Sequence, residues 1–364
     1  MRSMKVNLDK KLLSSYEIHI GNGIMERIAL LIAKNHKASR HIIITDSNVN
    51  RLYGPKLLAG LKNVGLNVDL IEFPAGESSK NINTVMDITG KLLEMGADRT
   101  SALIAFGGGV VGDMVGFVAS VYMRSIPYIQ IPTSLIAQVD SSIGGKTAID
   151  LTCGKNLLGT FYQPKAVFTD LNFLETLPEK EFNNGLAEII KYGIIDDEKM
   201  FRLLEENMDT IKGKDEALLK KIVESCCRIK KSIVEIDERE QGLRRILNYG
   251  HTLGHALEAQ SDFAISHGEG VALGMIAAAH ISERAGYLAT QGRERIEGLI
   301  HQAGLPNGIP NKLAVDKIIS RLQMDKKKKG EVIHFVLLKK IGMPFVNGGI
   351  DDRIIAEVIE GMKQ

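Results

Sequence analysis

The chain has 364 residues, enough for two domains, because a single hydrophobic core rarely grows beyond about 250–300 residues. Hydrophobic residues make up 44% and charged residues 25% of the sequence, values that are typical of globular proteins. The 46 basic and 44 acidic side chains nearly cancel to a net charge of +2. This balance argues against a protein that binds nucleic acid or membrane surfaces.

The cysteine content and the first residues bear on the compartment. Cys153, Cys226 and Cys227 cannot all pair with one another, and two of them are neighbours, so we expect no disulfide framework. The N-terminal residues lack the apolar segment of a secretory signal, and no run approaches the ~18 apolar residues of a membrane span. We expect a cytoplasmic protein.

The first half of the chain alternates between two patterns. Five short apolar runs predict buried parallel strands at residues 41–45, 67–73, 101–106, 128–132 and 166–170. The segments between them, at 50–64, 80–95 and 113–122, have apolar residues at helical spacing. This alternation predicts an α/β domain with a doubly wound, mostly parallel sheet.

The second half has a different character. Amphipathic helical spacing replaces strand-like alternation in four long segments, residues 181–195, 198–212, 215–236 and 243–260. A late strand is expected near residues 332–338. We therefore expect a mainly α-helical second domain, with the boundary near residue 174, so that residues 1–174 and 175–364 form the two domains.

A glycine-rich turn follows the third predicted strand. Gly107, Gly109 and Gly112 match the pattern G-x-G-x-x-G, which predicts positive φ angles and backbone N–H groups that approach a pyrophosphate at a helix N-terminus. The motif comes late in the chain for a dinucleotide fingerprint, and no acidic residue ends the next strand. An ordinary glycine turn explains the pattern almost as well.

Three further polar residues also follow predicted strands. Asp46 ends the first of these strands and is the better candidate for a ribose-binding carboxylate. Glu77 and Lys80 follow the second strand and are candidates for the same nucleotide ligand. Each of the three also fits a helix cap or a surface charge.

Histidines are concentrated in one stretch of the second half. Three of the nine histidines, His251, His255 and His267, lie among apolar and glycine residues. His251 and His255 are four residues apart on a predicted helix and share one face, as in helical zinc sites. The spacing fits a metal-binding His255 and a hydrogen-bonded core histidine equally well.

Glu188 is the candidate oxygen ligand. Its neighbours Leu186, Ile189 and Ile190 place it on an apolar face, where an unpaired charge costs several kcal/mol. A metal ion or Lys191, three residues on, supplies the partner that such a carboxylate needs, although a surface position is equally consistent with the pattern. A carboxylate and two imidazoles leave a fourth metal position open for substrate or water.

Six blocks of the sequence resemble one family. They are GGGVVGD, IPTSLIAQVDSSIGGKTAID, KNLLGTFYQP, GLAEIIKYG, DEREQGLRRILNYGHTLGHALE and SHGEGVALGM, which occur in the same order in 3-dehydroquinate synthases. The resemblance extends from about residue 40 to about residue 340. One such block is weak, whereas six in order argue strongly against chance.

The resemblance implies specific roles for residues of this chain. Glu188, His251 and His267 are implied to bind a zinc or cobalt ion, and His255 moves to the substrate side. The residues implied to bind NAD are Asp46, Glu77, Lys80, Gly108, Gly109, Asp113, Thr133, Ser134, Asp140 and Thr176, with Lys155 between NAD and substrate. The residues implied to meet the substrate are Arg124, Lys146, Asn156, Lys191, Lys230, Arg244, Asn248 and His255, and Lys326 is a further phosphate candidate.

The implied reaction suits these side chains. The family converts 3-deoxy-D-arabino-heptulosonate 7-phosphate to 3-dehydroquinate and phosphate in the shikimate pathway, by transient oxidation with NAD, phosphate elimination, reduction and aldol closure. Arginine and lysine side chains suit a substrate that carries both a carboxylate and a phosphate. The resemblance also implies a homodimer.

Three other functions remain open from the sequence. Other sugar phosphate cyclases share the fold and cofactors, and a metal-dependent polyol dehydrogenase of similar architecture releases NADH instead of phosphate. A nucleotide-binding regulatory module is a weaker alternative, since it has no need of three metal ligands.

Overall fold

The chain folds into two compact units, Met1–Phe173 and Leu174–Gln364. The computed structural model describes residues 15–262, 264–329 and 333–364, and for residues 324–329 it describes the backbone alone. Within these described ranges, no helix combines the length and apolar character that a membrane crossing requires.

A six-stranded parallel sheet forms the centre of the first unit. Its strand order is β1-β8-β5-β4-β2-β3, and every pairing is parallel. The strands are β1 (Glu17–Gly21), β2 (His41–Asp46), β3 (Val68–Phe73), β4 (Ala102–Gly107), β5 (Tyr128–Pro132) and β8 (Ala166–Asp170). The five predicted strands are confirmed, and β1 is an additional edge strand.

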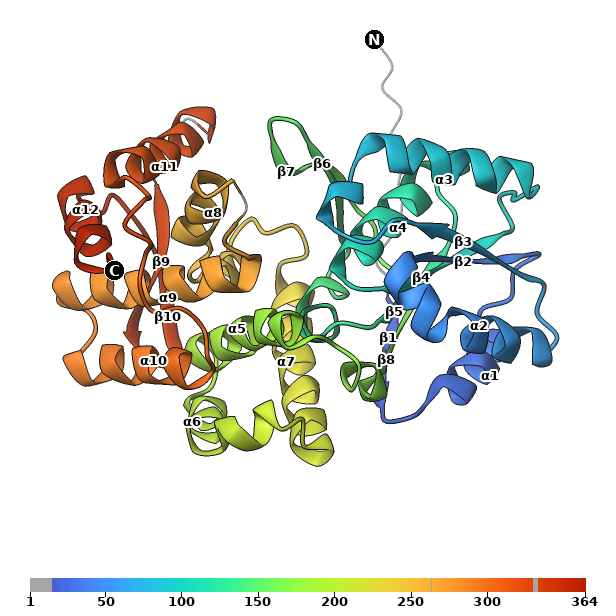
Figure 1. Cartoon of the computed structure of the whole chain (residues 1–364), viewed down its shortest axis with the longest axis horizontal. Coiled ribbons are helices and arrows are strands. Elements are labelled where there is room, and N and C mark those ends of the chain that lie inside the picture. Colours follow the sequence, from blue (N-terminus) through green and yellow to red (C-terminus); the bar gives the residue numbers. More distant parts are fainter. Residues whose placement is uncertain (1–14, 263, 330–332) are drawn as a thin grey trace, which may run out of the picture. The chain divides into compact units, whose positions relative to one another are not determined.

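Helices cover both faces of this sheet, as Figure 1 shows. Ile43 and Ile104 pack with the helices α1 (Met25–Asn35) and α2 (Ser47–Asn63). Ile42 and Leu103, the neighbouring residues in the same strands, pack with α3 (Ile82–Glu94) and α4 (Gly109–Val121) on the opposite face. Successive strand residues point to opposite faces, so strands covered on both sides must be apolar throughout.

The strand order reverses direction at the carboxyl ends of two neighbouring strands. β2 leads to β3 on one side, whereas its neighbour β4 leads to β5 on the other side. Ligands of doubly wound sheets bind at such a point of reversal. Asp46 ends β2 and Gly107 ends β4, so both border this position.

Shorter elements complete the first unit. An antiparallel hairpin joins β6 (Lys146–Leu151) to β7 (Gly154–Phe161). Four short helical turns connect larger elements: η1 (Glu77–Ser79), η2 (Tyr122–Arg124), the π-helix η3 (Ala137–Ser141) and η4 (Leu171–Leu174). None of these was predicted from sequence periodicity.

The second unit is mainly helical, as expected. Its helices are α5 (Glu179–Ile195), α6 (Glu198–Lys212), α7 (Glu216–Ile236), η5 (Leu243–Asn248), α8 (His251–Gln260), α9 (His267–Arg284), α10 (Thr290–Gln302), α11 (Val315–Lys329) and α12 (Asp352–Gly361). The expected late strand is β9 (His334–Lys340), which pairs with β10 (Met343–Gly348). The single helix predicted over residues 243–260 is wrong, because Gly250 interrupts it with a φ of 81°.

Candidate active site

Close packing of α8 against α9 brings histidines of both helices together. A Cβ atom on Gly250 would lie 2.7 Å from the Val271 carbonyl oxygen, and one on Gly254 would lie 2.8 Å from the Gly270 carbonyl oxygen. On α9, a Cβ atom on Gly274 would lie 1.8 Å from the Gly250 carbonyl oxygen. Only glycine fits at these positions, so the backbones approach one another directly. His251 and His267, at the starts of the two helices, are thereby neighbours.

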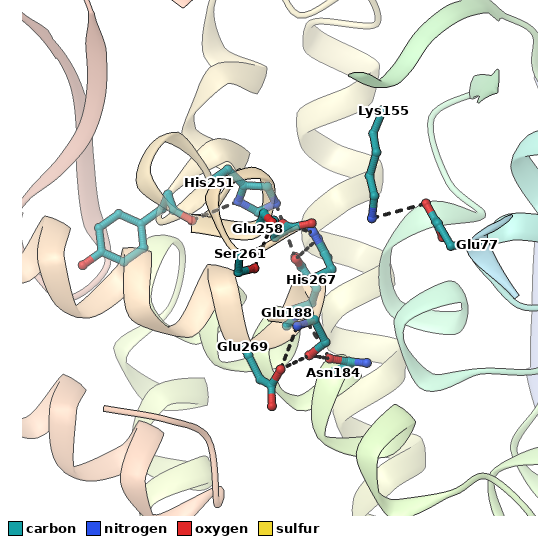
Figure 2. Close-up of polar contacts among 12 residues, drawn as sticks. Glu77, Lys155, Asn184, Glu188, His251, Glu258, Ser261, His267 and Glu269 are labelled. Carbon is teal, nitrogen blue, oxygen red and sulfur yellow. Dashed lines mark hydrogen bonds and ion pairs between the residues drawn. The ribbon is translucent and has the colours of Figure 1, made fainter. Parts of the chain in front are cut away.

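Glu188 of α5 meets both histidines (Figure 2). Its Oε1 atom lies 3.5 Å from His251 Nε2 and 3.4 Å from His267 Nε2. Ligands at about 2.0–2.1 Å from a tetrahedral ion are separated by about 3.3 Å, so the observed spacing fits such a site. Within the described part of the chain, neither Glu188 oxygen has a hydrogen bond of good geometry, although the side chain is completely buried. These three residues fit a divalent metal ion.

Both histidines are oriented by an acceptor at the opposite ring nitrogen. His251 Nδ1 lies 3.1 Å from the carbonyl oxygen of Tyr249. His267 Nδ1 lies 3.0 Å from a carboxylate oxygen of Glu258, which is 3% exposed. A proton held at Nδ1 leaves the Nε2 lone pair directed at Glu188, as in metal sites where a carboxylate or carbonyl supports the ligand histidine.

Glu188 remains charged despite its burial. Burial raises its pKa, but the positive charge of Lys191 and the interaction with His251 lower it well below its usual range. Lys191, itself 1% exposed, forms an ion pair with Glu188 one turn along α5. Both partners suggested by the sequence, the lysine and a candidate metal position, therefore lie beside this carboxylate.

His255 does not join the first ligand set. A second group with metal-binding side chains consists of His255, Glu258 and His267, and it shares His267 with the first. In that second group His267 would have to use Nδ1, the atom already bonded to Glu258. Part of His255 reaches solvent, so it is not a fully buried core histidine. The geometry therefore favours Glu188, His251 and His267.

Three buried cations lie on contacting elements of the second unit. Lys191, Lys230 and Arg244 belong to α5, α7 and η5, which pack against one another, and all three are less than 7% exposed. Lysine and arginine are rarely buried without a role for their charge. Such a group suits an anionic ligand.

A carboxylate organises the loop that carries Arg244. Asp237 accepts hydrogen bonds from the backbone N–H groups of Gln241, Gly242 and Arg244, at 2.9, 2.7 and 3.0 Å. Farther along η5, the side-chain amide of Asn248 donates to the carboxylate of Glu240. Asp237 thus fixes the path of the chain from α7 into η5.

The glycine turn of the first unit differs from the expectation. Positive φ angles were expected, but none of Gly107, Gly108, Gly109 and Gly112 has one. Glycine is required at position 107 because a side chain would clash with its neighbour. A Cβ atom on Gly107 would lie 2.4 Å from Val111 Cγ2. A Cβ atom on Gly108 would lie 3.2 Å from the Ser134 hydroxyl.

An unsatisfied hydroxyl also faces this turn. Ser134 Oγ is buried and, among the described residues, has no hydrogen-bond partner. A buried polar atom without a partner is costly, so it indicates a position for a polar ligand. Thr133 follows β5 beside it, and its N–H donates to the Gly107 carbonyl oxygen at 2.9 Å. The turn fits a nucleotide that approaches the N-terminus of α4.

Several other predicted nucleotide and substrate residues form one polar cluster in the first unit. Lys80, 4% exposed, donates to Asp113 and to Asn156, both at 2.6 Å. Asp113 raises the pKa of this lysine against the opposite effect of burial. Lys155 lies 3.5 Å from Glu77 (Figure 2). Because β7 supplies Asn156 and Lys155, the hairpin brings the two predicted sets together.

The remaining predicted site residues occupy separate positions. Asp46 caps α2 by accepting from the N–H groups of Asn48 and Val49, as the alternative interpretation of a helix cap anticipated. Arg124 ends η2, Lys146 begins β6, Asp140 lies in η3, and Thr176 lies between η4 and α5. The side chain of Lys326 lies outside the described residues.

Supporting residues of the metal centre were missed. Glu258 lies seven residues after His251 and three after His255, a spacing that repeats on one helical face. Ser266 and Glu269 have the S-x-x-E spacing of a capping box and mark the start of α9. Both signals are present in the sequence, whereas the contact of Asn184 with Ser266 spans 82 positions and has no local signature.

Comparison with known proteins places the chain in a family. Models of the N-terminal and C-terminal parts of 3-dehydroquinate synthase match residues 70–184 and 185–328. The 3-dehydroquinate synthase of Desulforamulus reducens is 45% identical over 343 residues, covering 94% of this chain and 95% of that protein. The chain belongs to the 3-dehydroquinate synthase family. The resemblance of the six sequence blocks is therefore confirmed.

Two solved structures of related synthases share the fold of this family member. One is the 2-epi-5-epi-valiolone synthase of Streptomyces hygroscopicus subsp. jinggangensis 5008 with bound NAD+ and Zn2+, at 26% identity and a TM-score of 0.90, covering 100% of this chain and 99% of that chain. The other is a 2-deoxy-scyllo-inosose synthase in complex with carbaglucose-6-phosphate, NAD+ and Co2+. It has 28% identity and a TM-score of 0.87, covering 95% and 96% of the two chains.

Proposed function

We propose that this chain is a 3-dehydroquinate synthase, a carbon–oxygen lyase that converts 3-deoxy-D-arabino-heptulosonate 7-phosphate to 3-dehydroquinate and phosphate in the shikimate pathway. The observation that carries the proposal is the convergence of Glu188, His251 and His267. Hydrogen-bond acceptors at the Nδ1 atoms orient the two histidines. NAD and one zinc or cobalt ion are its cofactors, as in the two related synthases whose structures contain them.

The cofactors and the chain divide the chemistry. When bound, the metal ion acts as a Lewis acid toward a substrate hydroxyl, and NAD takes up and returns a hydride. The chain supplies the ligand set, whose supporting partners are Tyr249 and Glu258. Its other residues bind the substrate, orient it and manage protons.

Buried cations are the proposed substrate contacts in the second unit. Lys191, Lys230 and Arg244 provide point charges and a bidentate donor for the carboxylate and phosphate of the substrate. We propose that the substrate's own phosphate serves as the base for its elimination, so that these side chains need only hold the substrate in place. Arg124, Lys146, Asn156 and Asn248 are proposed to make further substrate contacts.

His255 is the proposed hydrogen-bond partner of a substrate hydroxyl beside the metal centre. Part of its surface reaches solvent, yet its enclosed ring position and the charges of His251 and His267 lower its pKa to about 3. Its imidazole is therefore neutral at physiological pH, and its lone pair can accept a hydrogen bond from a substrate hydroxyl.

The predicted NAD residues form the proposed cofactor site. Ser134 and the glycine turn suit a pyrophosphate at the N-terminus of α4, and the position of Asp46 at the end of β2 suits a ribose. The other proposed contacts are Glu77, Lys80, Gly108, Gly109, Asp113, Thr133, Asp140, Lys155 and Thr176.

Among the possible cyclase substrates, we propose the heptulosonate phosphate because its carboxylate suits the buried cations. The chain is more similar to the 3-dehydroquinate synthase of D. reducens, at 45% identity, than to the two other synthases, at 26% and 28%. Phosphate release from the heptulosonate phosphate should exceed release from glucose 6-phosphate by several orders of magnitude, and Arg244→Ala should narrow that difference. Equal turnover of both sugars contradicts the assignment.

Two properties of the whole protein complete the proposal. We propose a homodimer. Light scattering after size-exclusion chromatography tests it, because a dimer has twice the 39.9 kDa mass of one chain. We also propose a cytoplasmic location, supported by three cysteines that form no disulfide within the described residues. Fractionation of the source cells tests that location.

A further inference from the structure

A side chain of α5 holds the start of α9. Asn184 Oδ1 lies 2.8 Å from the Ser266 hydroxyl and accepts from the Gly268 N–H group at 3.2 Å. Its Nδ2 atom donates to Glu181 at 3.3 Å. The orientation of the amide follows from these partners, because a flipped amide would point N–H groups at the Gly268 donor. Asn184 is 8% exposed, and its bond to Gly268 is buried.

The two bonded residues flank a metal ligand. Ser266 and Gly268 are the chain neighbours of His267, and Asn184 lies one turn before Glu188 on α5 (Figure 2). One side chain therefore connects the helix that carries the carboxylate ligand to the backbone on both sides of a histidine ligand. The distance between Glu188 and His267 depends on that connection.

The backbones of α5 and α9 are in direct contact at this point. A Cβ atom on Gly268 would lie 2.5 Å from Asn184 Cα and 2.8 Å from the Asn184 carbonyl oxygen. The first turn of α9 thus rests directly on the backbone of α5. Removal of the Asn184 amide would take away the two hydrogen bonds that hold this turn on α5.

The start of α9 has an independent cap. Glu269 Oε2 accepts from the Ser266 N–H group at 2.7 Å and lies 2.7 Å from the Ser266 hydroxyl. The hydroxyl has one proton, which is shared between Glu269 and Asn184. Loss of Asn184 leaves the capping box in place, so it changes where α9 begins relative to α5 without abolishing the helix.

We propose that Asn184 is a positioning residue of the metal centre, which sets the separation of Glu188 and His267 by holding Ser266 and Gly268. The inference rests on the proposed metal site and extends it to a residue that touches neither the metal nor the substrate. A ligand displaced by a few tenths of an ångström leaves the tetrahedral arrangement, and loss of a supporting partner typically weakens metal binding by about 10–100-fold.

The test measures metal release and metal geometry on the full chain. Wild type, Asn184→Ala and the control Asn183→Ala are loaded with Co2+; the visible absorption bands report coordination, and a chromophoric chelator reports the rate of metal loss. We expect Asn184→Ala to release Co2+ at least about 10-fold faster, with altered bands. Asn183 lines the same surface cavity beside Asn184, so Asn183→Ala should match wild type.

Two further variants keep the proposal open to contradiction. Should Asn184→Ala fail to fold, Ser266→Ala removes one of the two bonds and should accelerate Co2+ loss severalfold. Asn184→Asp, combined with Glu181→Gln to keep a donor between them, retains the acceptor oxygen and should restore slow release. Wild-type release from Asn184→Ala, with only its thermal stability lowered, overturns the positioning role. Failure of wild type to bind Co2+ overturns the metal site itself.

Discussion

His267 and Glu258 are joined by a hydrogen bond of 3.0 Å between the Nδ1 atom and a carboxylate oxygen. The bond connects the first residue of α9 to a residue of α8 that is almost fully buried. It fixes the rotation of the imidazole ring and directs Nε2 toward Glu188, so we expect it to act on the proposed metal site through His267.

Replacement of Glu258 should weaken metal binding. Glu258→Ala removes the acceptor and should lower the affinity for Zn2+ by about 10–100-fold, whereas Glu258→Gln keeps an acceptor oxygen and should lower it less. Competition with a chromophoric chelator measures both affinities. Equal affinities in wild type and Glu258→Ala would show that the bond has no influence on the ligand.

Metal binding should release a proton near neutral pH. Burial lowers the pKa of His267, but Glu188 and Glu258 raise it to about 10 in the metal-free protein. A metal ion needs the neutral ring, so its affinity should rise with pH up to that value and about one proton should leave at pH 8. Calorimetric titration of the metal-free chain in two buffers with different ionisation enthalpies counts the protons. A count of zero contradicts a protonated His267.

Asp237 should affect substrate affinity more than metal content. Asp237→Ala removes three backbone hydrogen bonds from the loop that leads to Arg244. At about 1 kcal/mol each, partly recovered from water, the loss should raise KM about 10-fold or more while bound zinc stays at the wild-type level. Glu235→Gln, two residues before it on the exposed end of α7, is the control. A fall in zinc content with unchanged KM would contradict this role.

The first unit should lose stability in mild acid. Burial lowers the pKa of His41 below its usual 6.5, and burial with repulsion from His19 lowers that of His36. The unfolded chain then binds more protons, so stability is full above pH 6.5 and falls as the pH drops below it. Denaturant unfolding at pH 7.5 and 5.5 measures the loss, which should shrink in His41→Gln but not in His301→Gln, an exposed control. Identical losses in wild type and both variants contradict the assignment.

The sequence predicted the central sheet because its strands are buried on both faces. Continuous apolar runs such as residues 41–45 and 101–106 leave few alternatives to a covered parallel strand. The β6–β7 hairpin escaped prediction because it carries Leu157 at 54% and Phe161 at 45% exposure, which hides any alternation of apolar and polar faces. The break before α8 depends on the contact of Gly250 with α9, which no local pattern reveals.

Residue spacing in the sequence predicted only part of the candidate metal site. Four-residue spacing pairs His251 with His255 on one helix, and both do lie near each other, with ring centroids 5.3 Å apart. His267 lies at the proposed ligand position because glycines of α8 and α9 bring the two helix starts together. That is a tertiary contact, which the sequence indicated only through the family resemblance. The roles of the NAD and substrate residues stay predictions.

The most direct test of the proposed function follows phosphate and NADH together. The full chain with NAD and Zn2+ is given 3-deoxy-D-arabino-heptulosonate 7-phosphate, and phosphate release and NADH absorbance are recorded in the same reaction. We predict many turnovers of phosphate with no accumulation of NADH, and loss of both turnover and bound zinc in His251→Ala. Stoichiometric NADH without phosphate would contradict the synthase and identify a dehydrogenase.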